Sequence, residues 1–262
     1  MLIVLSPAKS LDYESPLATD KRSEPTMLDQ ASELVEIMAT KSPRQLSNLM
    51  GISAELAELN ADRFQDWELP FTPETARQAI LAFSGDVYQG LDAAAAFNQR
   101  DFTHSQKVLR ILSGLYGVLR PLDLMMPYRL EMGTKLKTKR GKTLYDFWGT
   151  RVADELNKAM VESPGEDALI NLASVEYAKA VDTTALEAPV VTPTFLDAKG
   201  SGDFKTIAFF AKRARGSMAG WIVKNRVKTV AELEGFDGLG YAYSSAHSTG
   251  DRPAFVRRNP AS

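Results

Sequence analysis

The sequence contains no cysteine and only two histidines, His104 and His247. The missing cysteines exclude disulfides, thiolate metal sites and cysteine nucleophiles, and they fit a reducing cytosol. The two histidines lie far apart in sequence and lack the paired spacing of a histidine metal site. An iron site would need carboxylates almost alone, and no such cluster stands out. We therefore expect no metal, no cofactor and a cytoplasmic location.

Motifs of enzymes and nucleotide-binding proteins are equally scarce. Neither a glycine-rich dinucleotide loop nor a P-loop occurs, because the segment Gly114–Gly117 is too short for either. Ser6 and Lys9 have the spacing of serine–lysine hydrolases, but Pro7 at the end of an apolar run favours a tight turn over the helix that those enzymes use. We expect no catalytic residue and a protein that is not an enzyme.

Length and composition are those of an ordinary globular protein, with 262 residues and an apolar share of 44%. No repeat, low-complexity tract or long linker divides the chain, so we expect one domain over residues 1–262. The apolar N-terminus lacks the basic leader and the long hydrophobic run of a signal peptide or membrane anchor, and it predicts a buried strand. We expect no membrane partner.

Hydrophobic periodicity predicts a mixed α/β (α+β) fold with a central sheet. The first strand is expected at residues 2–5, and apolar positions three and four apart predict a helix over 27–40. Short β-branched runs at 190–196 and 204–210, joined by a glycine-containing turn, predict a β-hairpin. Further helices are predicted at 72–83, 102–112, 144–160 and 216–225, and further strands at 168–172, near Tyr241 and near Phe255.

Charge is segregated along a chain whose net charge is only −2. Residues 101–150 hold nine Lys and Arg against four Asp and Glu, and residues 201–262 hold ten against five. The other segments are acidic. Such segregation can gather a positive face on an acidic protein, and the local field then steers a polyanion. The alternative is that these cations are solvated surface residues that never meet.

Residues 43–64 resemble a helix-hairpin-helix motif, which binds DNA without reading its sequence. Gly51, Ile52 and Ser53 occupy its hairpin, and Arg63 is a nearby cation; serine replaces the usual second glycine. Glycine lets the backbone approach a phosphate, and amides at the next helix N-terminus can donate to its oxygens. The alternative is a plain helical hairpin, which the acidic neighbours of the motif favour.

Two short segments concentrate positive charge. One runs from Lys135 to Lys142, and in an extended chain its alternation would place Lys135, Lys137 and Lys139 on one face, with Arg140 following. The other is a hydrophobic run that delivers cations into the start of a helix, where an anionic partner would offset the unfavourable helix dipole. Its cations are Lys212, Arg213 and Arg215.

Long motifs throughout the chain resemble the YaaA family. They are Leu2–Tyr13, Leu112–Leu124, Tyr128–Gly133, Tyr145–Gly149, Asn171–Ser174 and Ala211–Gly216.

The resemblance implies a cytosolic bacterial protein that is induced by hydrogen peroxide and limits damage by unincorporated iron. It also implies non-sequence-specific binding to the phosphate backbone of double-stranded DNA, through a positively charged cleft and the helix-hairpin-helix, on a fold peculiar to the family. Protection from iron chemistry is then expected to be indirect. The cations in family motifs are the expected cleft walls, namely Lys9, Arg120, Arg129, Lys212, Arg213 and Arg215.

Two other functions stay open at this point. One is a glycosylase-like enzyme that acts on nucleic-acid bases, with Tyr13, Tyr128, Tyr145 and Trp148 around a flipped base. The Gly-Pro-Asp element of such glycosylases is missing from this sequence. The other is an interaction protein whose cations contact a protein partner instead of DNA.

Overall fold

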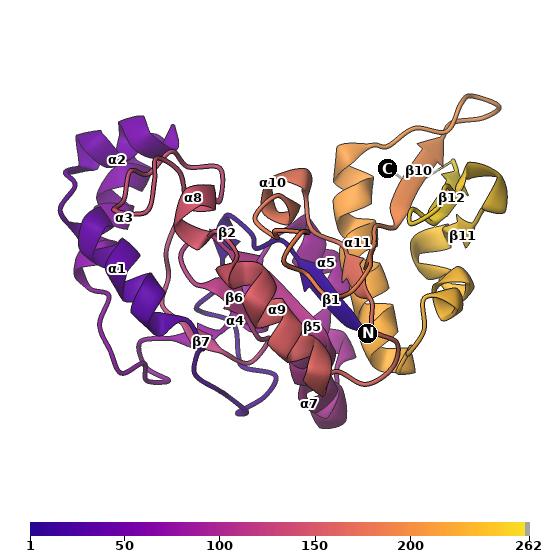
Figure 1. The fold of residues 1–262 in the computed structure, drawn as a ribbon, viewed down its shortest axis with the longest axis horizontal. Coiled ribbons are helices and arrows are strands. Elements are labelled where there is room, and N and C mark those ends of the chain that lie inside the picture. The colour runs from indigo at the N-terminus through magenta and orange to yellow at the C-terminus, as the bar shows by residue number, and fades with distance from the viewer. Residues whose placement is uncertain (260–262) are drawn as a thin grey trace.

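A five-stranded sheet lies at the centre of the molecule in a computed structural model, which describes residues 1–259 (Figure 1). The strand order is β6-β5-β1-β8-β9. Four of these strands run parallel, and β6 is antiparallel to β5. All four residues of β1 are buried, as expected for a parallel strand that is covered on both faces. The strands are β1 (Leu2–Leu5), β5 (Leu109–Ser113), β6 (Gly117–Leu119), β8 (Leu169–Asn171) and β9 (Val190–Val191).

A second sheet, of three strands, lies at one end of the long axis (Figure 1). Its order is β10-β12-β11, with β10 (Thr194–Ala198) parallel and β11 (Ala242–Tyr243) antiparallel to β12 (Ala254–Arg258). Two small ladders complete the strands. They pair β2 (Ser10–Leu11) with β4 (Phe83–Ser84) and β3 (Arg77–Gln78) with β7 (Leu124–Met125).

Helices cover the central sheet and build the end of the molecule opposite the second sheet, where α1, α2 and α3 lie together (Figure 1). The helices are α1 (Leu28–Ala39), α2 (Pro43–Met50), α3 (Ala54–Gln65), α4 (Ala79–Ala82), α5 (Asp86–Leu91), α6 (Ala93–Ala96), α7 (Gln99–Val108), α8 (Leu144–Trp148), α9 (Arg151–Glu162), α10 (Val175–Ala178) and α11 (Ala208–Asn225). Short 3₁₀ helices span Ala231–Gly235, Gly238–Gly240 and Ser245–His247.

The structure confirms the mixed α/β fold with a central sheet. It also confirms the first strand, the helix at α1 and the strands β8, β11 and β12. These segments are apolar runs or apolar periods, and each contributes residues to the hydrophobic core or packs against it, as Tyr243 of β11 does.

Three predicted helices are wrong in extent. Residues 72–83 form turns, two short strands and the single helical turn α4. The helix predicted at 102–112 ends at Val108, because Leu109–Ser113 is fully buried in the sheet as β5. The helix predicted at 144–160 is broken at Gly149, which separates α8 from α9.

The predicted hairpin of 190–196 with 204–210 is wrong. Val190–Val191 belongs to the central sheet, and β10 pairs in parallel with β12 in the other sheet. An isolated bridge links Asp197, one residue after the first predicted strand, to Lys205 in the second. From Ala208 the chain is helical, since buried residues recur at helical spacing through α11.

Helix α11 lies directly against the backbone of α5. The contact is possible because both helices carry glycine at the crossing: a Cβ added at Gly216 would overlap the carbonyl oxygen of Val87, and one at Gly90 would overlap that of Arg213. No side chain separates the two helices there. Their relative position is therefore fixed by backbone contact, which also fixes the side chains that α11 points toward the loop after β1.

Replacing Gly216 by alanine tests this crossing. Alanine favours a helix by about 1 kcal/mol over glycine, but overpacking costs about 1–3 kcal/mol and a clash with backbone lies at the upper end. We expect a net loss in the free energy of unfolding, measured by urea denaturation. Gly235→Ala is the matched control, because its Cβ would meet the Trp221 ring at 3.8 Å, an ordinary contact. Equal stability of the two variants would contradict the argument.

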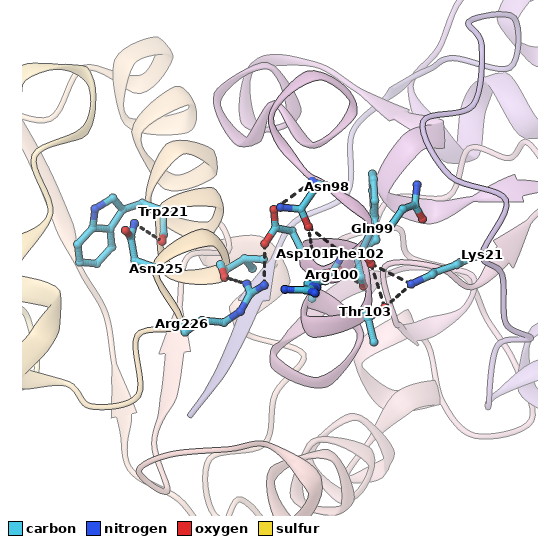
Figure 2. Close-up of polar contacts among 12 residues, drawn as sticks. Lys21, Asn98, Gln99, Arg100, Asp101, Phe102, Thr103, Trp221, Asn225 and Arg226 are labelled. Atoms are coloured by element: carbon cyan, nitrogen blue, oxygen red, sulfur yellow. Dashed lines mark hydrogen bonds and ion pairs between the residues drawn. The ribbon is translucent and has the colours of Figure 1, made fainter.

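The C-terminus of α11 is tied to the N-terminus of α7 (Figure 2). Arg226 ends α11 in the left-handed conformation, with φ of 56°, and pairs with the buried Asp101 at 2.7 Å. Asp101 also accepts a hydrogen bond from the backbone N–H of Asn98, whose side chain caps α7. Burial acts to raise the pKa of Asp101, but the hydrogen bonds from Asn98 and Arg226 and the charge of Arg226 hold it below its ordinary value.

A lowered pKa means that the Asp101 carboxylate stabilises the fold above its ordinary pKa of 3.8 and ceases to do so as the pH falls through the folded-state pKa. Asp101→Asn should lower the free energy of unfolding at pH 7 by about 1 kcal/mol, because the partner Arg226 is partly solvated. The difference from the wild type should shrink below pH 3.8. Urea titrations at pH 7 and pH 3 measure it, with the exposed Asp20→Asn as control. A gap that is constant with pH would refute this role.

Candidate functional site

A cavity of about 430 Å³ opens at the carboxyl ends of the central parallel strands. The next strand after β1 in this sheet is β5, on one side of β1, whereas the next after β8 is β9, on the opposite side of β8. Such a reversal between adjacent strands leaves a crevice outside their carboxyl ends, where α/β proteins bind ligands. The walls are the loop Ser6–Ser10 after β1, Leu172 and Ser174 after β8, the segments 84–87 and 128–131, Glu176, Tyr177, and Lys212 and Arg215 of α11.

A serine pair holds the two strand ends together. The backbone N–H of Ser174 donates to Oγ of Ser6 at 2.8 Å, and the Ser6 hydroxyl lies 3.3 Å from that of Ser174. The hydroxyl of Tyr88 in α5 donates to the Ser6 carbonyl at 3.0 Å. Burial raises the pKa of Tyr88 well above its ordinary value, so this hydroxyl stays protonated as a donor. The floor of the cavity is therefore a fixed, neutral and polar surface.

The structure brings four of the six expected cleft cations to this cavity. Lys9, Arg129, Lys212 and Arg215 come from separate parts of the chain and all line it. Lys9 and Lys212 are exposed at its rim, with 64% and 56% of their side chains accessible. Charges that are scattered in sequence thus meet on one concave surface.

Carboxylates offset three of these cations. Glu131 receives Lys9 at 2.8 Å on one oxygen and Arg129 at 3.1 Å on the other. Lys212 lies 3.9 Å from Asp86 at the start of α5.

Arg215 differs from these cations. It makes no hydrogen bond or ion pair with any residue in the described range 1–259, and burial lowers its pKa. The cavity therefore contains one cation that the protein itself does not neutralise.

Arg215 also lines a second cavity, of about 390 Å³, beyond the ends of β8 and β9. The other charged residues of this lining are Lys179 and Arg252, and no Asp or Glu belongs to it. Polar groups come from Asn171 and from threonines that include Thr192. The charged residues of the second cavity are thus all cations, and the two cavities share the side chain of Arg215.

Arg120 and Arg213, also expected in the cleft, lie outside the lining of both cavities. Arg120 pairs with Asp123 at 2.9 Å and donates to the carbonyl of Glu24. Arg213 stacks near the Phe209 ring at 5.8 Å. Arg213 is separated from Lys212 and Arg215 because residues 212–215 are helical. Successive side chains therefore diverge by about 100° instead of emerging together from a strand end.

The cationic segment after Met132 lies elsewhere. The expected alternation is present, because Lys135, Lys137 and Lys139 are exposed while Leu136 between them is buried. These lysines do not line either cavity. Arg140 fixes the segment against α1: it pairs with Glu33 at 2.8 Å and lies 4.6 Å above the Phe147 ring.

Residues 43–64 fold as two helices joined by a tight turn. Gly51 ends α2 in the left-handed conformation with φ of 64°, Ile52 is buried, and the Ser53 hydroxyl accepts from the N–H of Leu56 to cap α3. Gly51 and Ser53 are exposed at the turn. Arg63 is half-buried, and its pKa is lowered by burial. The two helices lie at the end of the molecule farthest from the second sheet, away from α11 (Figure 1).

The aromatic pocket expected of a base-acting enzyme is not assembled. Only Tyr128 of the four aromatics lines the cavity. Trp148 is fully buried, and its indole N–H donates to the carbonyl of Gly114. The hydroxyl of Tyr13 donates to the carbonyl of Met125. The Tyr145 hydroxyl donates to the carbonyl of Glu176.

Sequence reasoning missed Asp86, Glu131 and Ser174 as members of the cavity, and it considered Ser6 only for its hydrolase-like spacing to Lys9. Ser6 and Ser174 carry a usable signal, because each follows a buried parallel strand at the edge where ligands bind. Asp86 and Glu131 carry none, since their opposition to Lys212 and Lys9 arises only in the folded chain. Within residues 1–259, no helix is long and apolar enough to cross a membrane, and no three His, Cys, Asp or Glu side chains are grouped to hold a metal ion.

Comparison with known proteins agrees with the motifs. The family model described as peroxide stress protein YaaA matches residues 1–247. A protein of Hahella chejuensis (strain KCTC 2396), described as a UPF0246 protein, is 54% identical over 257 residues, covering 98% of this chain and 99% of that relative. The chain therefore belongs to the YaaA family of peroxide stress proteins.

Proposed function

We propose that this chain is a non-sequence-specific double-stranded DNA-binding protein of the hydrogen-peroxide stress response, acting in the cytoplasm without catalysis. The observation that carries the proposal is the convergence of Lys9, Arg129, Lys212 and Arg215 on one concave surface of an acidic protein. A field of this kind attracts a polyanion even when the total charge is negative. The family supports a role in peroxide stress.

A duplex is too wide to enter a cavity of about 430 Å³, so the backbone would lie across its mouth. Lys9 and Lys212 at the rim are placed for phosphate contacts, which give affinity and position without reading sequence. The turn of the helical hairpin would add a second contact through the exposed backbone at Gly51 and Ser53. The exposed lysines before α8, Lys135, Lys137 and Lys139, would extend this contact with the backbone of the duplex. Limitation of iron-mediated damage then acts at the DNA, and iron itself is not bound.

The double charge reversal Lys9→Glu with Lys212→Glu tests the proposal. Affinity for duplex DNA should fall by more than tenfold at 100 mM salt, and the salt dependence should lose about 0.9 log unit per log unit of salt for each phosphate contact removed. Fluorescence anisotropy over a salt series measures both quantities.

The matched control reverses two exposed lysines on other helices, Lys107 in α7 and Lys158 in α9, and changes the net charge equally. The control should bind nearly as the wild type does. Equal losses in the two double variants would mean that total charge, not the cleft, determines binding. A wild-type affinity that does not change with salt would reject DNA backbone binding altogether.

Glu131→Gln provides a gain-of-binding test. This side chain holds both Lys9 and Arg129, so a neutral amide should release their charge toward a phosphate. We expect tighter duplex binding, by severalfold, with a steeper salt dependence than the wild type. The same anisotropy series measures it, and an affinity unchanged by Glu131→Gln would show that the two cations do not meet the backbone.

A further inference from the structure

Arg215 is the feature of the cavity that the proposed duplex contact leaves unexplained. It is half-buried on α11, whereas the neighbouring cavity lysine Lys212 is exposed, and it makes no hydrogen bond or ion pair with the described residues. A partly buried charge without an ion-pair partner in residues 1–259 is available to an anion from outside the protein. A phosphate that lies across the mouth would meet Lys212 first, so Arg215 needs an anion that enters the cavity.

The surroundings of Arg215 favour such an anion. The second cavity adds Lys179 and Arg252 to the lining around Arg215 and contributes no carboxylate, so three cations share that lining. The lining of the first cavity also includes Glu131, whose oxygens pair with Lys9 and Arg129. Arg215 is thus suited to a phosphate, and Glu131 to hydroxyl or amino donors.

Size and polarity narrow the ligand further. A cavity of about 430 Å³ falls within the range of about 300–1,000 Å³ for small-molecule sites. Its position between the ends of β1 and β8 is the ligand-binding crevice of α/β sheets. Ser6 and Ser174 contribute hydroxyls, and Tyr177 contributes an aromatic side chain to the same lining.

We propose that the cavity between β1 and β8 binds one phosphorylated sugar unit, as in a nucleoside monophosphate, with its phosphate on Arg215 and its sugar hydroxyls facing Glu131 and Glu176. The unit is either a free molecule or a single nucleotide displaced from a DNA strand, because both present the same phosphate and sugar. The proposal does not depend on binding of the protein to a paired duplex.

The test is calorimetric titration of the full-length protein, without DNA, with AMP and ribose 5-phosphate, and with adenosine as the probe that lacks phosphate. We expect saturable binding of the two phosphates and at least tenfold weaker binding of adenosine. Arg215→Gln should weaken AMP binding by more than tenfold, since it removes a bidentate donor. Lys107→Gln, at an exposed lysine of α7 outside both cavities, should leave it unchanged.

Stability separates this role from a structural one. Because Arg215 has no partner in the protein, ligand-free Arg215→Gln should unfold at the same temperature as the wild type or higher. AMP should raise that temperature only in the wild type. If Arg215→Gln proves less stable, Arg215→Lys keeps the charge without the fork and should bind AMP with intermediate affinity. Full AMP binding by Arg215→Gln, or equal binding of AMP and adenosine, overturns the proposal.

A second arm distinguishes the source of the unit. A duplex with one unpaired nucleotide is compared with the fully paired duplex, in wild type and Arg215→Gln. Preference for the unpaired nucleotide that disappears in Arg215→Gln indicates a displaced nucleotide, and AMP binding without this preference indicates a free molecule. Absence of both overturns the proposal, even where the paired duplex binds. Loss of paired-duplex binding with AMP binding retained rejects only the DNA function.

Discussion

The direct contact between α5 and α11 determines where the cations of this protein can act. Glycine at the crossing brings the two helical backbones together, with no room for a Cβ at Gly216 or Gly90. Lys212 and Arg215 are held by this contact opposite the loop that follows β1. The carboxylate of Asp86 is carried on the first residue of α5 and is positioned by the same crossing. The central sheet supplies the opening, and the crossing supplies its charged wall.

Electrostatics in the cavity combine attraction with restraint. The cations gather there although the chain is acidic overall, but Glu131 and Asp86 neutralise most of them in the empty protein. The resulting surface attracts anions less strongly than its number of cations implies. It favours ligands that carry groups complementary to both cations and carboxylates. Arg215 is the exception, because burial lowers its pKa and no carboxylate of the described residues pairs with it.

The sequence was informative where one periodicity extends over a whole element. The strand at 2–5 and the helix at α1 are clear for this reason. It was misleading where an apolar run continues across a change of structure, as at Leu109, where α7 becomes β5, and at Ala208, where α11 begins within a predicted strand. Partners distant in sequence decide those cases. The cavity shows the same dependence on distant partners. Its cations lie in recognisable family motifs, but two of the expected cleft cations are placed elsewhere by the folded chain. Arg213 diverges from its neighbours on a helix, and Arg120 pairs with Asp123.

Arg215 belongs to the walls of two cavities, and this has a thermodynamic consequence. The guanidinium has a fixed set of donors, so an anion that engages them from one side withdraws them from the other. Two anions, one in each cavity, would draw on the same donors of Arg215, and the resulting coupling would be reciprocal because it is a property of the free energies of binding. The antagonism requires no movement of helices or sheets. A single shared side chain makes the two compartments compete.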